Sequence, residues 1–116
     1  MNLIARAVEA MSIRKLKGSS KKTGKCLLAA SGDLTISVIS QNHTDLMKFY
    51  PDFSSFEFDL SAVEEIDCSG IQLLLAFEYS AQKEGKQLTL NSASAVVTEA
   101  MDVININDQF NWAASK

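Results

Sequence analysis

One segment, residues 55–91, restricts the possible folds more than any other part of the chain. Residues 55–60 alternate between apolar and polar side chains, which predicts a strand with one buried face. Residues 69–84 repeat apolar side chains at helical spacing, and residues 87–91 alternate again. A strand, a helix and a strand in this order form a βαβ unit, so the two strands are expected to pair in parallel through a right-handed crossover.

The residues before this unit predict a hairpin and a helix. Residues 12–31 contain two short strand-like runs around a loop bounded by glycines, which indicates a hairpin with a long tip. A helix is predicted from about Ile36 to Phe49, with Thr35 as its cap and Pro51 just beyond its end. Its apolar face is expected to hold Ile36, Ile39, His43, Leu46, Met47 and Tyr50.

The whole pattern predicts an α/β fold with a small mixed sheet. A last helix is expected after Ser92 or Ser94, either of which could cap it. Because both strands of the βαβ unit alternate, helices are expected to lie mainly on one face of the sheet, with the other face more open. A chain of 116 residues forms one domain with its own core. We place a leader and the first hairpin strand in residues 1–24 and the main domain in residues 25–112.

Charge is distributed unevenly along the chain. The first 25 residues carry seven basic and one acidic side chain, whereas the remainder carries four basic and thirteen acidic ones. The acidic body argues against nucleic acid as a partner. Within the leader, an apolar stripe at helical spacing predicts a short amphipathic helix that docks on the domain or forms a weak homodimer through residues 1–11. The stripe consists of Leu3, Ile4, Ala7, Val8 and Met11.

Several classes of protein are excluded by what the sequence lacks. No apolar run is long enough to span a membrane. The two cysteines, Cys26 and Cys68, lack a C-x-x-C spacing, which favours a reducing, cytoplasmic compartment. His43 is the only histidine, so a zinc site is not expected, and no residue pattern calls for a cofactor.

The junction between the strand and the helix of the βαβ unit contains the best candidate site. Ser69 lies at the predicted helix N-terminus, beside Asp67 and before Gly70. Free backbone N–H groups at a helix N-terminus favour an anion, including a covalently attached phosphate. The simpler interpretation of Ser69 is a helix cap. For Asp67 the choice is between a solvated turn residue and one that orients the Ser69 hydroxyl.

The neighbours of Ser69 complete the candidate surface. Glu64 and Glu65 add negative charge close to it, and Cys68 is interpreted as an inert small side chain. Ile71 lies at the edge of the apolar stripe and could face a partner, whereas Gln72 points away from the stripe. No nucleophile, base and orienting group occur together, so no catalytic residue is predicted and the chain is not expected to be an enzyme.

The stretch FDLSAVEEIDCSGIQLLLA resembles the signature of the STAS family, named for sulfate transporters and anti-sigma factor antagonists. That family has a D-[ST]-[SA]-G motif at the start of a helix, here Asp67-Cys68-Ser69-Gly70. The stretches SGDLTI and GKQLTLNSAS match two further parts of the pattern, and the resemblance extends from about Lys25 to Phe110. It implies the STAS fold, with no catalytic machinery.

The resemblance to stand-alone bacterial anti-sigma factor antagonists also implies a function in partner-switching control of transcription. In those proteins the third residue of the motif, here Ser69, is phosphorylated by a switch kinase that is also the anti-sigma factor, and phosphorylation abolishes binding. The implied partner surface consists of Glu64, Glu65, Asp67, Cys68, Ser69, Gly70, Ile71 and Gln72. Cys68 replaces the usual serine or threonine, and Asn105 occupies a region where many members have glycine.

Two other functions fit the same resemblance. The chain could be a structural subunit like the small STAS subunit of bacterial lipid-asymmetry transporters, which binds an ATPase without acting as a switch. It could also be an adaptor linked to chemotaxis or sensory kinases, an alternative favoured by Gln72 where sigma-pathway members often have a small residue.

Overall fold

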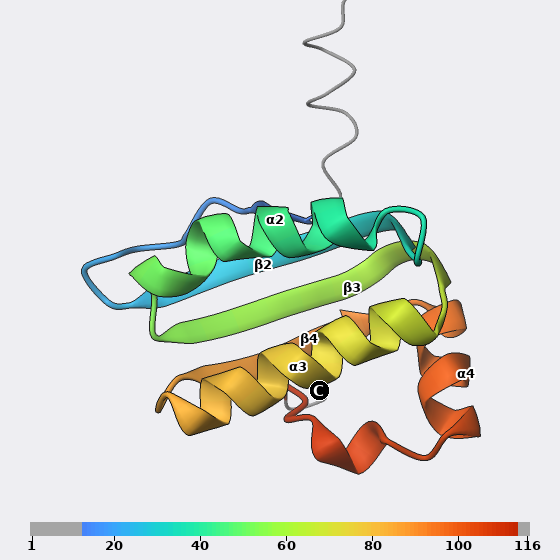
Figure 1. Cartoon of the computed structure of the whole chain (residues 1–116). Coiled ribbons are helices and arrows are strands. Elements are labelled where there is room, and N and C mark those ends of the chain that lie inside the picture. The colour runs from blue at the N-terminus through green and yellow to red at the C-terminus, as the bar shows by residue number, and fades with distance from the viewer. Residues whose placement is uncertain (1–12, 114–116) are drawn as a thin grey trace, which may run out of the picture.

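The computed structural model describes residues 13–113, which form a four-stranded mixed sheet with helices packed against it (Figure 1). The strand order is β1-β2-β3-β4, with β1 antiparallel to β2 and the other neighbours parallel. The strands are β1 (Ile13–Lys15), β2 (Lys25–Leu34), β3 (Ser55–Ile66) and β4 (Gln87–Ala93); the helices are α2 (Ile39–Phe49), α3 (Cys68–Lys83) and α4 (Ala95–Val103), with short 3-10 turns at Tyr50–Asp52 and Asn107–Gln109. The predicted α/β fold, the hairpin and the parallel βαβ unit are confirmed.

The core lies between the sheet and its helices. Phe56, Phe58 and Leu60 point from β3 into this core and are fully buried. Helix α2 contacts β1 and β2, while α3 contacts the inner strands and β4, so the two helices lie side by side over one face (Figure 1). The opposite face is polar: Glu57 pairs with Lys25 there. Alternation in the sequence therefore predicted correctly which face the helices cover.

Two strands are longer than their sequence patterns indicated. Strand β2 continues through Leu34, and β3 continues to Ile66 instead of ending near Leu60. Residues 61–66, which lie between the predicted strand and the predicted helix, are therefore strand, because they pair in parallel with the second half of β2. Irregular register and a positive φ of 76° at Gly32 accompany this pairing. The apolar and polar side chains no longer alternate strictly at these irregularities. For this reason the sequence pattern did not predict the ends of the two strands.

Helix α2 starts later than predicted, and its predicted apolar face is only partly buried: Leu46 and Tyr50 are in the core, whereas Ile36, His43 and Met47 are exposed. It begins at Ile39 after Val38, and Thr35 does not cap it. The fully buried polar residues on this helix are Asn42 and Asp45, whereas His43 and Met47 are exposed. Asp45 accepts a hydrogen bond from the Gln41 side chain, with Nε2 2.7 Å from Oδ1. Packing over β1 and β2 decides which face is covered, and here it overrides the apolar periodicity.

Ser94, one of the two residues predicted to precede the last helix, occupies the N-cap position of α4. Its side chain makes no capping hydrogen bond. The helix predicted for residues 2–11, and any homodimer through residues 1–11, lie outside the described residues. The division between a leader ending at residue 24 and a main domain stays a prediction. Within residues 13–113, no helix is long and apolar enough to cross a membrane.

Candidate functional site

Asp67 connects the starts of both helices at one end of the sheet. Its Oδ1 accepts hydrogen bonds from the backbone N–H of Ser69 (2.9 Å) and of Gly70 (3.2 Å), which makes it the N-cap of α3. Its Oδ2 accepts the N–H of Ile36 at 2.9 Å, in the loop that leads to α2. One carboxylate therefore fixes two segments that are 31 positions apart in sequence.

These bonds also stabilise the charged form of Asp67. Donation from the Ile36 N–H, and then from the N–H groups of Gly70 and Ser69, lowers the pKa of this carboxyl below its ordinary value. Asp67 is thus ionised at neutral pH. Its negative charge lies beside the first turn of α3, where the helix dipole favours it.

Gly70 is required because α3 starts in close contact with the end of β2. A Cβ at this position would lie 2.2 Å from the Leu34 carbonyl oxygen and 2.8 Å from a side-chain carbon of Ile66. The Leu34 carbonyl also accepts the N–H of Asp67 at 3.2 Å. Any side chain at position 70 would push α3 away from the sheet and alter the position of Ser69.

Ser69 lines an open hollow between the starts of α2 and α3. The hollow has a volume of about 580 Å³ and is bounded by Ile36, Ile39, Ser40, His43, Thr44, Ser69, Gln72 and Leu73. The Ser69 side chain is half-buried, and its hydroxyl has no hydrogen-bond partner among residues 13–113. This hydroxyl is therefore free to meet a partner or a reagent that enters the hollow.

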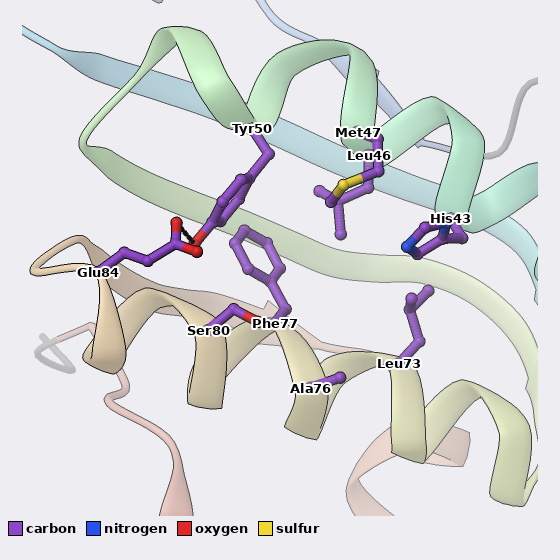
Figure 2. A pocket seen from close by; sticks show the side chains of 9 residues that line it. All are labelled: His43, Leu46, Met47, Tyr50, Leu73, Ala76, Phe77, Ser80 and Glu84. Atoms are coloured by element: carbon purple, nitrogen blue, oxygen red, sulfur yellow. Dashed lines mark hydrogen bonds between the residues drawn. The ribbon is translucent and has the colours of Figure 1, made fainter.

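A second, more enclosed hollow of about 210 Å³ continues from the first along the two helices. Figure 2 shows its side chains projecting toward each other, with His43, Met47 and Tyr50 from the α2 side and Leu73 and Phe77 from α3. The two hollows share His43 and Leu73. We call the combined depression, from Ser69 to Glu84, the α2–α3 groove.

The far end of the α2–α3 groove is closed by an aromatic and charged cluster. The Tyr50 hydroxyl donates to Glu84 at 2.8 Å (Figure 2), and burial, with this carboxylate next to it, raises the pKa of Tyr50 to about 12. The Lys86 ammonium donates to the Tyr50 carbonyl at 2.7 Å and lies 4.1 Å from the centroid of its ring. The ring of Tyr50 stacks on Phe56 and meets the edge of Phe77.

The predicted partner surface is only partly assembled around the groove. Ser69 and Gln72 line it, whereas Glu64, Glu65 and Cys68 are exposed residues that do not line either hollow. Ile71 is 5% exposed and packs in the core, so it offers a partner almost no surface.

Residues of α2 and of its leading loop form the other wall of the groove, and the sequence pattern did not predict them there. Ile36, Ile39 and His43 are the clearest cases. Their helical spacing predicts a core face instead. The sequence offers no signal for this wall, because the 68% exposure of Ile36 is a property of the folded chain.

Two expectations about Ser69 need correction. Asp67, not Ser69, caps α3. The N–H groups of Ser69 and Gly70, which were expected to be free for a phosphate, are taken by Asp67 because its side chain folds back over the first turn. An attached phosphate would therefore meet a carboxylate before it met these donors.

Comparison with known proteins identifies relatives of the fold. A family model described as "Mlab, STAS domain" matches residues 18–111. No curated protein sequence matches the chain. Three solved structures of low identity share its fold, and at such identity the likeness extends to the fold alone.

The first is the anti-sigma factor antagonist SpoIIAA in its unphosphorylated form, with 11% identity, a TM-score of 0.64 and coverage of 90% of this chain and 89% of that one. A candidate anti-sigma factor antagonist from Thermotoga maritima has 14% identity, a TM-score of 0.71 and coverage of 89% and 85%. An anti-sigma factor antagonist from Mycobacterium paratuberculosis has 14% identity, a TM-score of 0.68 and coverage of 91% and 89%.

Proposed function

The chain belongs to the STAS domain family, and from this premise we propose that it is a non-enzymatic binding module of a bacterial partner-switching pathway. In this proposal the protein is cytoplasmic, and a histidine-kinase-like serine kinase that is also an anti-sigma factor, or a related sensory kinase, binds its unphosphorylated form and phosphorylates Ser69. The solved structures of similar fold, which include anti-sigma factor antagonists, support this class of function.

The observation that carries the proposal is the position of the Ser69 hydroxyl. It lies in the first turn of α3, unpartnered among the described residues, and lines an open hollow whose other wall comes from α2. A binding partner could cover this hollow and reach the hydroxyl at the same time. The site thus combines a contact surface with an accessible acceptor oxygen.

Phosphorylation would change this surface through charge. A phosphate on Ser69 adds a charge of roughly −2 at neutral pH. Asp67 is already ionised and its carboxylate accepts the Ser69 N–H, so two negative groups would then share the first turn of α3. A partner that had covered a neutral hydroxyl would have to desolvate a dianion, which costs binding free energy. The phosphorylated form is therefore the unbound state.

The decisive experiment identifies the partner and the modified residue together. The tagged protein is used to isolate partners from cells of its source, and each recovered ATPase is purified and incubated with the protein and ATP. Mass spectrometry of the protein should find phosphate on Ser69. In titrations, Ser69→Ala should bind the kinase as tightly as the native chain, and Ser69→Asp should bind at least tenfold more weakly.

Two control variants separate the switch from general effects. Ser40→Ala removes a hydroxyl on the opposite wall of the same hollow, and this variant should still be phosphorylated. Thr98→Asp adds a charge on the exposed side of α4 and should bind normally. Phosphate on another residue, or native affinity of Ser69→Asp, would refute the proposal.

A second candidate is a structural subunit that binds the ATPase of a lipid transporter without being a switch. The capping of α3 favours it, because Asp67 occupies the N–H groups that would otherwise hold a phosphate. The Mlab name in the family description is compatible with it. Recovery of a transporter ATPase that binds the chain and leaves Ser69 unmodified would support this candidate over the kinase-linked one.

A further inference from the structure

The open hollow beside Ser69 differs in chemistry from the acidic end of the domain around it. Glu64, Glu65 and Asp67 lie at this end, and none of these carboxylates lines the hollow. Its polar lining consists instead of side chains that can donate a hydrogen bond, namely Ser40, His43, Thr44, Ser69 and Gln72. A hollow with several donors and none of these carboxylates in its walls suits an anion.

The donors come from two helices and face the same space. On α2, Ser40, His43 and Thr44 lie three and four positions apart, so they share one face of the helix. On α3, Gln72 follows Ser69 by three positions, which places their β-carbons about 5–6 Å apart. Figure 2 shows the His43 ring projecting from α2 toward α3. Within residues 13–113 the side chains of His43 and Gln72 make no hydrogen bond or ion pair, so both are available.

A phosphate on Ser69 needs donors that the first turn of α3 does not supply. The N–H groups of Ser69 and Gly70 already donate to Asp67. The hollow has a volume of about 580 Å³, which admits a phosphate without moving either helix. Among the described residues that line it, only His43 can carry a positive charge. A hydrogen bond from an imidazolium to a phosphate is charge-assisted, and such bonds are about twice as strong as neutral ones.

We propose that a phosphate on Ser69 turns into the hollow and is held there by His43 from α2 and Gln72 from α3. The inference rests on the proposed phosphorylation of Ser69 and adds the residues that receive the phosphate. The held phosphate fills the hollow and joins the two helices. A partner that binds the unphosphorylated chain then loses both the open hollow and the free hydroxyl.

Phosphorus NMR tests the position of the phosphate through its second pKa, which is ordinarily about 6. Phosphoserine is placed at position 69 during translation through an amber codon, so no kinase is needed. Outside the hollow, Glu64, Glu65 and Asp67 would raise this pKa, because like charges disfavour the dianion. Inside it, His43 and Gln72 lower the pKa by donating to the dianion. The two positions therefore shift the pKa in opposite directions.

The same phosphorylated protein unfolded in urea provides the reference. The titration midpoint of the folded protein should lie below that of the unfolded protein by about 0.5 pH unit or more. A folded midpoint at or above the unfolded one would overturn the proposal. Because the phosphate is supplied without a kinase, this result concerns the phosphate site alone, whereas failure to find a kinase for Ser69 concerns the proposed function.

Two substitutions that each remove a basic side chain from α2 provide the matched control. His43→Gln, made in the phosphorylated protein, should raise the midpoint toward the unfolded value. Lys48→Gln removes a positive charge from the same helix, outside both hollows, and should leave the midpoint unchanged. Circular dichroism checks that both variants stay folded. No shift in His43→Gln, or equal shifts in both variants, would contradict a direct contact between His43 and the phosphate.

Discussion

Different interactions hold the two ends of the α2–α3 groove. At the Tyr50 end, aromatic rings pack against each other, and the Tyr50 hydroxyl and the Lys86 ammonium tie the ends of both helices together. At the Ser69 end, one carboxylate, Asp67, holds the two helix starts through backbone N–H groups. The first end combines buried rings with hydrogen bonds, whereas the second has hydrogen bonds alone around an open hollow.

This difference indicates that the Tyr50 end stabilises the packing of the two helices, whereas the Ser69 end serves binding. The stacked rings at the Tyr50 end are held by apolar burial, which does not depend on the charge at Ser69, so this packing can keep α2 against α3 whatever happens there. Hydrogen bonds to a carboxylate respond to pH and to a neighbouring charge. The Ser69 end can therefore change its binding properties while the fold persists.

The largest effect is expected at the closed end, from Phe77→Ala. Phe77 is 4% exposed and meets the rings of Tyr50, Phe56 and Phe58. Its loss leaves a cavity and should lower the free energy of unfolding by about 3–5 kcal/mol, measured by urea titration.

Tyr79→Ala is the matched control, because Tyr79 lies on the same helix and is 63% exposed. It should change the free energy of unfolding by no more than about 0.5 kcal/mol. Similar losses in both variants would show that helix formation, not burial of the ring at position 77, is what the closed end requires.

An intermediate effect is expected at the open end from Gly70→Ala. The new methyl group would overlap the Leu34 carbonyl oxygen, and backbone cannot rotate away as a side chain can. Overpacking of this kind costs about 1–3 kcal/mol of unfolding free energy, and partner binding should weaken because Ser69 moves with the helix.

The neighbouring substitution Ser69→Ala is the control for this effect. It keeps the Cβ that is already present and removes only an oxygen without a partner among residues 13–113. Its unfolding free energy should stay within about 0.5 kcal/mol of the native value. If Gly70→Ala also left the unfolding free energy unchanged, the close contact between α3 and β2 would not require glycine at position 70.

The smallest effect on stability is expected from Asp67→Asn, and it should depend on pH. Asparagine can still cap α3 through its carbonyl oxygen, but its NH₂ group cannot accept the N–H of Ile36. Because folding lowers the pKa of Asp67, its charge stabilises the fold above the ordinary aspartate pKa of about 3.9, and this contribution is lost as pH falls through the folded-state pKa. The difference in Tm between variant and native protein should therefore be largest near neutral pH and shrink in acid.

Glu64→Gln provides the comparison for this measurement, since it removes an exposed negative charge from the preceding strand without removing a cap. Its Tm difference from the native chain should be smaller at neutral pH than that of Asp67→Asn. A difference for Asp67→Asn that stays constant from neutral to acid pH would mean that the charge of Asp67 does not fix the two helix starts.

The sequence by itself determined the sheet, the order of its elements and the position of the junction at Ser69. Alternation in β3 and β4 and helical spacing in α3 are local properties, and each is set by side chains within a few positions of one another. The same local information located the motif Asp67-Cys68-Ser69-Gly70 at the start of a helix. It also predicted which face of the sheet the helices cover.

Only the tertiary structure decided which residues surround Ser69. The bond from Ile36 to Asp67 joins residues 31 positions apart, and the pairing of β2 with β3 converts an acidic stretch into strand. Helix α2 buries Asn42 and Asp45 because of where it lies on the sheet, and so it turns His43 and Met47 toward α3. Such contacts depend on how segments that are distant in sequence pack against each other. The period of an apolar pattern contains no information about this packing.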